Sequence, residues 1–347
     1  MHNDMPTKML DEGYDPDVRH TPAEGHTDLP RLAESGITAQ FLAAWVDAPY
    51  AATVPDSSFA RAMRYIDAIH GLVSRHPELL RFATTGDDVR HAKRDGKVAI
   101  FIGVEGGHAI EGSLDHLRTF YQCGARYLTL TWNNGNAWAG SSIGSGGTRT
   151  GGLTPFGEQV IREMERLGML VDVSHTSDET LDDVLAIATR PVIASHSCAR
   201  ALADHPRNLT DAQLRAIARS GGVVNVNFYP RFLDAGFCRA MDAAESALVP
   251  AASAEERRAA LAAIPPVPLD TLIDHIDHIA RVAGTDHVGL GSDFDGIAAT
   301  PAGLDDVTGF PRIARALMAR GYSADDVEKV LGANMLRVLD DVLRAPA

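Results

Sequence analysis

The sequence contains few cysteines, no long apolar run and no surplus of positive charge, and each of these absences excludes a class of protein. Its three cysteines (Cys123, Cys198 and Cys238) form no C-x-x-C pattern, which indicates reduced thiols and not a disulfide framework. No stretch approaches the roughly 18 consecutive apolar residues of a membrane helix, so we expect no membrane span. The net charge of −14 argues against nucleic acid as a partner, because phosphate binding requires clustered Lys and Arg.

The N-terminus also lacks the apolar core of a secretory signal, which predicts a cytoplasmic protein unless a processed signal or anchor lies upstream. The 347 residues are 45% hydrophobic, enough for two ordinary domains or for one large α/β barrel. No low-complexity linker divides the chain, so we expect a single domain over residues 1–347. The glycine-rich stretch GSSIGSGGTRTGG (140–152) predicts a loop over a site.

Short apolar runs alternate with amphipathic segments, which predicts a parallel α/β sheet. The expected strands cover residues 37–45, 98–104, 126–131, 169–174, 191–195, 222–228 and 287–292. The expected helices cover residues 57–75, 113–122, 155–167, 178–188, 210–219, 268–283, 308–320 and 324–343, the last being a C-terminal helix.

Seven strands are visible, and the opening MHNDMP suggests the tail of an eighth whose body is truncated or very short. Eight strands would close a (β/α)8, TIM-like barrel. A doubly wound open sheet is the alternative fold. The chain has neither a G-x-G-x-x-G after its first strand nor a P-loop, which argues against that alternative.

Polar residues follow several of the apolar runs at the point where each strand ends. Glu105 comes after FIGV, His175 after VDVS, His196 after VIAS and Asp293 after GLGS, while Trp132 and Asn133 follow LTLT. In a barrel these strand ends meet on one face, where active sites are built. Imidazole and carboxylate ligands together suit zinc and similar divalent ions. A strand-end Asp is also a common helix cap, but four such ends are hard to attribute to capping alone.

Two His-x-Asp pairs compete for a place in this cluster. The first is His2 and Asp4 in MHNDMP, and the second is His26 and Asp28 in GHTDLP. Residue chemistry alone favours the later pair, because the earlier one begins at the second residue.

The segments that carry these residues resemble the membrane dipeptidase (renal dipeptidase) family of binuclear zinc peptidases, which are amidohydrolase-like barrels. The resemblance covers nearly the whole chain. The matching segments are HND (2–4), FIGVEGGHAI (101–110), YLTLTWN (127–133), GLTPFGEQVIREMERLGMLVDVSH (152–175), PVIASHS (191–197), RNLTD (207–211), VVNVNFY (223–229) and GLGSDFDG (289–296).

The resemblance implies two Zn²⁺ ions bridged by Glu105. His2, Asp4 and Glu105 would hold one ion, and Glu105, His175 and His196 the other, leaving His26 and Asp28 structural. Asp293 would be the general acid and base for attack by a metal-bridging hydroxide. Arg207 would bind the C-terminal carboxylate of the substrate, and a homodimer is possible.

The chain departs from the family at Trp132, where better-known members have a histidine after LTLT. Trp132 and Asn133 are therefore expected to contact the substrate and to alter its preference. The expected substrate is a small dipeptide with a free C-terminal carboxylate and a tolerated C-terminal D-residue. The alternatives are an N-acyl amino acid deacylase, or another amidohydrolase, with the same metal site, and a non-catalytic metal-binding barrel.

Overall fold

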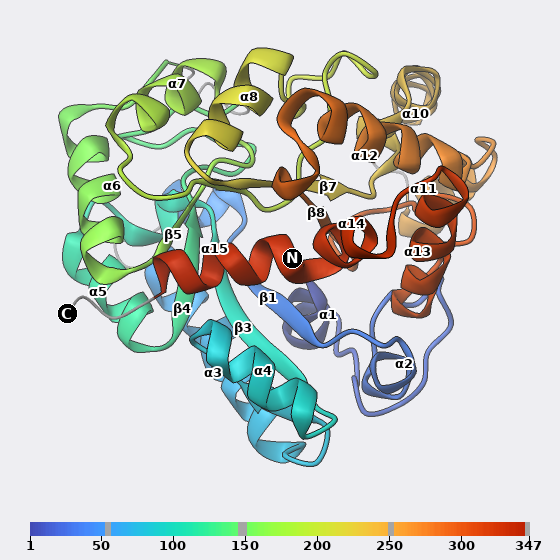
Figure 1. Ribbon diagram of the computed structural model, residues 1–347, viewed down its shortest axis with the longest axis horizontal. Helices are drawn as coiled ribbons and strands as arrows, with labels where there is room; N and C mark the ends of the chain where they lie inside the picture. The colour runs from blue at the N-terminus through green and yellow to red at the C-terminus, as the bar shows by residue number, and fades with distance from the viewer. Residues whose placement is uncertain (53–56, 145–150, 249–252, 344–347) are drawn as a thin grey trace.

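The computed structural model describes residues 1–52, 57–144, 151–248 and 253–343, and a sheet of parallel strands lies at its centre (Figure 1). Seven of the strands pair in chain order, each parallel to the next, and all seven agree with the predicted runs. They are β1 (Ala39–Trp45), β3 (Val98–Glu105), β4 (Ala125–Thr129), β5 (Leu170–Asp172), β6 (Ile193–Ala194), β7 (Val223–Asn227) and β8 (Val288–Gly291). The short strand β2 (Leu80–Phe82), which was not predicted, pairs with the start of β3.

Residues 1–4 lie between the two ends of this sheet and close it into a barrel. The amide of Ala43 in β1 donates to the carbonyl oxygen of Asn3 at 2.9 Å. On the other side, the amide of Asp4 donates to the carbonyl oxygen of Phe294, just after β8, at 2.8 Å. The segment that the sequence predicts as the tail of an eighth strand is therefore bonded on both sides, and the fold is the predicted α/β, TIM-like barrel.

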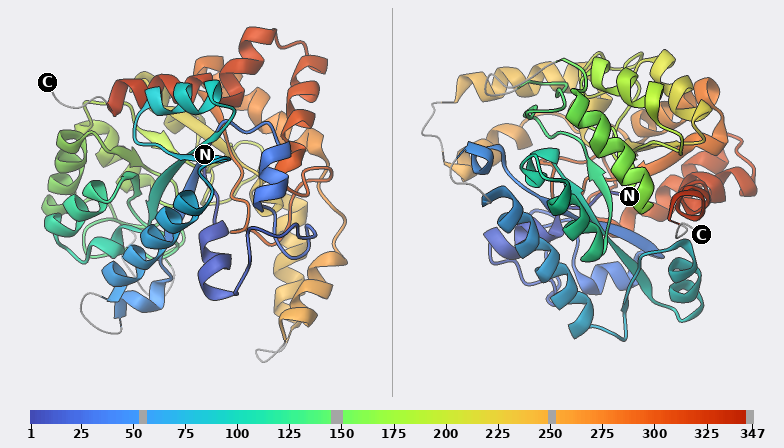
Figure 2. Two further views of the ribbon diagram at one scale, coloured as in Figure 1. Left: turned by 90° about the horizontal axis from the view of Figure 1, so that it is seen from below. Right: turned by 90° about the vertical axis from the view of Figure 1, so that its left-hand side faces the viewer.

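Helices form a layer around the sheet, as the three views show (Figures 1 and 2). Four of them begin where the sequence predicts because Ser113, Thr154, Ser177 and Thr210 accept a hydrogen bond from the first-turn backbone. The helices that match predicted segments are α3 (Ser57–Arg75), α5 (Leu114–Gln122), α6 (Pro155–Leu167), α7 (Asp178–Ile187), α8 (Asp211–Arg219), α12 (Leu269–Ala283) and α13 (Phe310–Ala319).

The C-terminal helix predicted over 324–343 is broken into three pieces. α14 (Ala324–Glu328) passes through a π-helical turn, η6 (Lys329–Ala333), into α15 (Asn334–Val342). The break lies at Gly332, whose backbone is not helical.

Several elements lie outside the predicted set. The α-helices among them are α1 (Met5–Asp11), α2 (Leu29–Glu34), α4 (Gly86–Arg94), α9 (Pro230–Leu233), α10 (Ala235–Ala247) and α11 (Ala254–Ala262). The 3₁₀-helices are η1 (Ala48–Ala52), η2 (Gly107–Ile110), η4 (Thr285–His287) and η5 (Val307–Gly309). No helix in the described part of the chain combines the length and the apolar character that a bilayer crossing requires.

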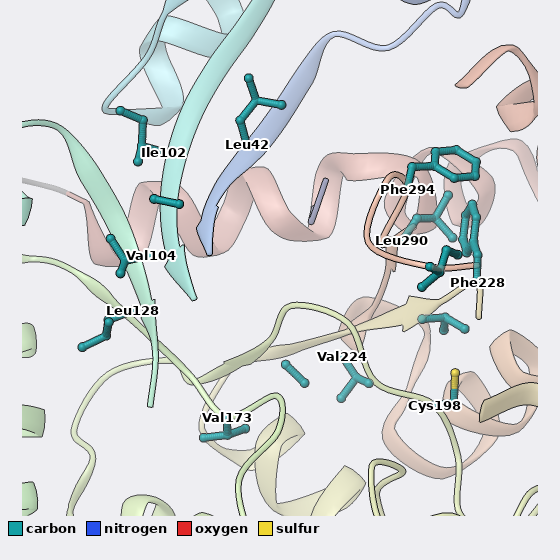
Figure 3. Packing of buried hydrophobic residues seen from close by; sticks show 14 of the residues in the cluster. Leu42, Ile102, Val104, Leu128, Val173, Cys198, Val224, Phe228, Leu290 and Phe294 are labelled. Carbon is teal, nitrogen blue, oxygen red and sulfur yellow. The ribbon is translucent and has the colours of Figure 1, made fainter. Parts of the chain in front are cut away.

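Alternate side chains of the strands form two separate apolar clusters, as expected from the period of two along a strand. One set, which includes Leu42, Ile102 and Val224, packs against the surrounding helices (Figure 3). The other set points into the barrel, where the rings of Phe41 and Phe101 stack 4.6 Å apart. α15 packs against this inner cluster. Apolar side chains therefore fill one end of the barrel interior. The polar inward-facing positions lie at the other end, where the strands have their carboxyl ends.

Candidate metal centre and catalytic site

The predicted ligands and the predicted general base meet at the carboxyl ends of the strands. Glu105 is the last residue of β3, and His175, His196 and Asp293 each lie two or three residues past the end of a strand. The segment that closes the barrel supplies the remaining two. The residues brought together are His2, Asp4, Glu105, His175, His196 and Asp293.

Glu105 lies between two groups of side chains and directs one carboxylate oxygen at each. Its Oε2 atom is 3.2 Å from Nε2 of His2. Its Oε1 atom is 3.0 Å from Nε2 of His175 and 3.5 Å from Nε2 of His196. The two imidazole nitrogens of His175 and His196 are themselves 3.0 Å apart. A carboxylate that bridges two metal ions with one oxygen on each ion has its oxygens divided in this way.

The group around His2 is crowded with carboxylates. Nε2 of His2 lies 3.3 Å from Oδ2 of Asp4 and 3.9 Å from Oδ1 of Asp293. The same nitrogen is buried and has no hydrogen-bond partner among the described residues. A buried polar atom without a partner is costly, and a cation between these donors would remove that cost.

The pKa values report the same excess of negative charge. Burial raises the pKa of Asp4 to about 7 and also raises that of Asp293, and nearby Glu105 adds to both shifts. Burial opposes ionisation of Glu105 as well, but His2 and the other two histidines outweigh it and hold its pKa well below the ordinary value. Burial lowers the pKa of His175 to about 4, so this imidazole is neutral at pH 7, as a metal ligand requires.

Two of the clustered residues have a left-handed backbone. His175 has φ of 69° and Asp293 has φ of 60°. Residues other than glycine rarely adopt this conformation, and it costs on the order of 1–3 kcal/mol where it is maintained. Both residues follow a strand directly, so the turn aims their side chains back over the barrel mouth.

A second layer of polar groups holds the three histidines by their Nδ1 atoms and leaves every Nε2 facing the cluster. The partners are Tyr127 for His2 at 2.7 Å, Ser195 for His196 at 2.7 Å and Asn133 for His175 at 3.1 Å. Sequence reasoning assigned Asn133 to the substrate, whereas its side-chain oxygen here faces a histidine.

Sequence reasoning missed four polar residues that support the cluster: Tyr127, Asp172, Ser195 and Asn227. The amide of Asn227 donates to Oδ2 of Asp293 at 2.8 Å. All four occupy alternate strand positions that face the inside of the barrel, as Glu105 does. Counting in steps of two along β4, β5 and β7 would have identified three of them.

Arg207 lies against this cluster as a buried cation. It is 3% exposed, and its Nη2 atom donates to the carbonyl oxygen of His196 at 3.2 Å. Its guanidinium stacks 5.3 Å from the ring centroid of Phe232. No carboxylate of the described residues pairs with it, and its buried Nε has no partner there. Such a group is ready to receive an anion from outside the chain.

Trp132 is half-buried at the edge of the cluster. Its ring centroid lies 6.4 Å from that of His175, and its ring meets the ring of Trp45 edge-on at 5.1 Å. The two tryptophans make an apolar wall beside the histidines. Of the predicted loop over 140–152, residues 145–150 lie outside the described part of the chain.

The second His-x-Asp pair, His26 and Asp28, lies outside the cluster and makes hydrogen bonds within the protein. Asp28 caps α2 by accepting from the amide of Arg31 at 2.8 Å and also accepts from the guanidinium of Arg31 at 2.7 Å. His26 accepts from the amide of Asp295 at 2.8 Å. His26 therefore supports the turn after β8, and Asp28 supports the start of α2.

The clustered donors fit divalent metal ions. His2 forms one compact group of donor atoms with Glu105 and His196 and another with Asp4 and Asp293, each within 4.8 Å. Imidazole nitrogens and carboxylate oxygens are the ligands that zinc prefers in hydrolytic sites.

The model of the family described as Membrane dipeptidase (Peptidase family M19) matches residues 1–346. The chain belongs to the membrane dipeptidase family. A dipeptidase of Clonostachys rogersoniana, Dipeptidase verJ, is 37% identical over 324 residues, which cover 91% of this chain and 76% of the relative.

Solved structures of metallopeptidases share the fold. A dipeptidase described as a metallo peptidase of the same family superimposes with a TM-score of 0.82 at 28% identity, covering 99% of this chain and 97% of its own. A metallo peptidase from Rhodobacter sphaeroides, solved with a phosphinate mimic of the dipeptide L-Ala-D-Ala, superimposes with a TM-score of 0.82 at 27% identity, covering 98% and 97%. This membrane dipeptidase homologue is thus a peptide hydrolase of a metal-dependent class.

Proposed function

We propose that the protein is a binuclear zinc dipeptidase that hydrolyses short peptides with a free C-terminal carboxylate. His2, Asp4 and Glu105 would hold one ion, and Glu105, His175 and His196 the other. The division of the two Glu105 oxygens between the two histidine groups supports this assignment. When bound, the ions would polarise the scissile carbonyl and lower the pKa of a shared water, giving a hydroxide at neutral pH.

The observation that carries the dipeptide proposal is the buried Arg207 beside this cluster. A guanidinium without a protein carboxylate binds a substrate carboxylate through two parallel hydrogen bonds. Arg207 contacts the carbonyl oxygen of the proposed ligand His196, so a carboxylate bound to it would lie near the metal site. A free C-terminal carboxylate close to the scissile bond is the mark of a dipeptide, which is why a dipeptide substrate is proposed.

Asp293 would act as the general base and then as the general acid. Asn227 fixes one of its oxygens, and the other faces His2. The free oxygen would accept a proton from the attacking water and later pass it to the nitrogen of the leaving amine. Burial raises its pKa, which matches an acid that must also donate.

The second residue of the substrate is proposed to tolerate the D-configuration. The relative from Rhodobacter sphaeroides binds a mimic of L-Ala-D-Ala. Trp132 stands where a histidine is expected, and its indole supplies only one N–H donor, so more of the oxyanion charge would fall on the metals. Trp132 is proposed to restrict the side chain next to the scissile bond.

The test is zinc-dependent amine release from L-Ala-L-Ala, L-Ala-D-Ala, L-Ala-D-Glu and the C-terminal amide of L-Ala-D-Ala. We expect hydrolysis of the free acids and a loss of about 10²-fold or more in kcat/KM for the amide, in line with an unpaired buried charge. The variant Arg207→Met should lose most of its activity on the free acids and its preference for them over the amide. An unaltered protein that cleaves acid and amide equally would refute the role of Arg207.

N-acetyl-D-alanine separates the proposal from the deacylase alternative, because it lacks the free amine of a dipeptide. Release of acetate from it, without cleavage of any dipeptide by the zinc-loaded protein, would reassign the substrate and leave the metal centre intact.

A further inference from the structure

Asp172 is a fully buried carboxylate at the end of β5 that touches none of the groups directed at the metals. Its Oδ1 accepts from the backbone amides of Ser174 at 3.1 Å and Ser195 at 2.8 Å. Its Oδ2 accepts from the hydroxyls of Thr129 and Ser195, both at 2.6 Å. No basic side chain among the described residues pairs with it. Four donors therefore hold this carboxylate in place behind the site.

Because the Ser195 hydroxyl has only one proton to donate, its hydrogen bonds determine which ring nitrogen of His196 carries a proton. The Ser195 hydroxyl has one proton and three neighbouring polar atoms. They are Oδ2 of Asp172 at 2.6 Å, Nδ1 of His196 at 2.7 Å and Oγ of Ser174 at 3.4 Å. Oδ2 of Asp172 accepts in the shortest of these three contacts, so the proton goes to Asp172. Ser195 must then accept from His196, whose Nδ1 carries the ring proton.

We propose that Asp172 and Ser195 form a positioning relay that sets the tautomer and the orientation of His196. With the proton on Nδ1, the lone pair of the neutral ring lies on Nε2, the atom that faces Glu105 at 3.5 Å. The relay thus presents a ligand that is ready for a metal before any metal arrives. The inference rests on the proposed metal centre and adds residues that lie behind it.

The relay is a carboxylate–histidine–metal arrangement lengthened by one hydroxyl. Where a carboxylate contacts a ligand histidine directly, it fixes the ring and raises the basicity of the ligand. Here Ser195 transmits both effects from Asp172 to His196. His2 and His175 have a phenol and an amide as their Nδ1 partners.

The same assignment of the Ser195 proton excludes a nucleophilic role for Ser195 in this set of Asp172, Ser195 and His196. In a catalytic triad the histidine takes the proton of the serine, and the carboxylate contacts the histidine. Here the serine lies between the carboxylate and the histidine, and its hydroxyl donates its proton in a hydrogen bond to Asp172. His196 donates to Ser195, so it has no free Nδ1 lone pair with which to activate the hydroxyl.

Three variants separate a positioning role from a merely structural one. Ser195→Ala removes the hydroxyl contact with His196 and keeps the backbone bond to Asp172. Ser195→Thr restores a hydroxyl. Thr129→Val is the matched control, because Thr129 donates to the same Asp172 oxygen at the same 2.6 Å without contacting a histidine.

The readout is Zn²⁺ affinity, measured by competition with a chromophoric chelator. We expect Ser195→Ala to bind one of its two zinc ions about 10–100-fold more weakly. Ser195→Thr and Thr129→Val should stay within a few-fold of the unaltered protein for both ions. A purely structural role predicts instead that Ser195→Ala and Thr129→Val weaken zinc binding equally, and that result would overturn the relay.

A second measurement needs no substitution and therefore survives a variant that fails to fold. Long-range ¹H–¹⁵N spectra of the zinc-free protein with ¹⁵N-labelled histidine should show His196 protonated at Nδ1 and not at Nε2. A signal for the Nε2–H tautomer would overturn the relay. An unaltered protein that binds no zinc would overturn the proposed metal centre, whereas normal zinc affinity in Ser195→Ala would overturn the relay alone.

Discussion

The two carboxylate oxygens of Asp293 have different surroundings: one is held by a hydrogen bond, and the other faces the cluster. Asn227 donates to one oxygen at 2.8 Å, while the other faces His2 at 3.9 Å, outside hydrogen-bond distance. Its backbone is left-handed, a conformation that asparagine tolerates as well as aspartate. An asparagine at this position would therefore keep the geometry and lose only the ability to exchange a proton.

We expect Asp293→Asn to retain its zinc and to lose about 10²–10⁴-fold in kcat on L-Ala-D-Ala. Metal analysis and steady-state kinetics on the same preparation measure both quantities. Asp295→Asn is the control, because Asp295 has a similar left-handed backbone but contacts His26 instead of the cluster. A fully active Asp293→Asn that keeps its zinc would contradict the assignment of Asp293 as the general base.

At the scale of single residues, the sequence predicts the groups that face the cluster better than the groups behind them. Glu105 and His196 are visible because a charged or basic residue directly after an apolar run is unusual. Tyr127 and Ser195 were missed, because an aromatic or a small hydroxyl near a strand end resembles core packing until its position is counted in steps of two from the inward-facing residues. The choice of His2 over His26 rested on resemblance, since both precede an aspartate with the same spacing.

Elements of the barrel differ in how closely their backbones pack. A Cβ atom at Gly103 in β3 would lie 1.9 Å from the ring of Tyr127, which is fully buried and bonded to His2. A Cβ atom at Gly71 in α3 would meet only the flexible end of Arg75 at 3.4 Å. The same substitution should therefore have opposite effects in the strand and in the helix.

We expect Gly103→Ala to lower the free energy of unfolding by about 1–3 kcal/mol through overpacking. Gly71→Ala should raise it by about 0.5–1 kcal/mol, because alanine loses less conformational entropy in a helix. Denaturant unfolding of the two variants beside the unaltered protein measures both changes. Equal effects of the two substitutions would show that the barrel tolerates additional volume beside Tyr127.

His275 is a neutral, fully buried ring that joins α12 to Ala199 and to the end of α9. It accepts from the amide of Ala199 at 3.1 Å, and its other nitrogen contacts the carbonyl oxygen of Leu233 at 2.9 Å. Burial lowers its pKa from 6.5 to about 4. As the pH falls below 6.5 the unfolded chain gains a proton that the folded chain refuses, so stability is lost between pH 6.5 and about 4.

The loss from His275 should reach roughly 2 kcal/mol by pH 5. His275→Gln keeps a polar side chain but has no proton to gain, so its free energy of unfolding should fall less between pH 7 and 5. Denaturant unfolding at both pH values, with both proteins zinc-free, gives the comparison. Identical pH slopes would rule out His275 as a source of acid sensitivity.

Prediction from sequence succeeds for some helices and strands and fails for others. The ends of α3 and α6 were predicted to the residue from apolar periodicity, and Thr154 also caps α6. The apolar residues of the 324–343 segment keep a helical spacing across Gly332, so the sequence pattern does not predict the π-helical turn. The three residues of β2 are too few to show any period.

At the scale of the whole molecule, the barrel brings together ligands that are far apart in the chain. The proposed ions would join residues 1–4 to the ends of β3, β5 and β6. Backbone pairing holds the closing segment 1–4 through only a few hydrogen bonds on each side. Two of its four residues are proposed ligands, so metal binding and closure of the barrel should be coupled.

We expect zinc removal to lower the melting temperature, since ions that bind only the folded chain add about 4 kcal/mol each at a free concentration 1,000 times Kd. The loss should be local as well as global. Amide exchange in a peptide covering residues 1–11 should accelerate on chelation more than exchange in α3, which lies on the outer layer. Glu105→Gln, which weakens the bridge between both ion sites, should reduce the zinc-dependent shift in melting temperature. Unchanged melting and exchange after complete zinc removal would show that backbone pairing alone closes the barrel, and that the ions serve chemistry without contributing to the fold.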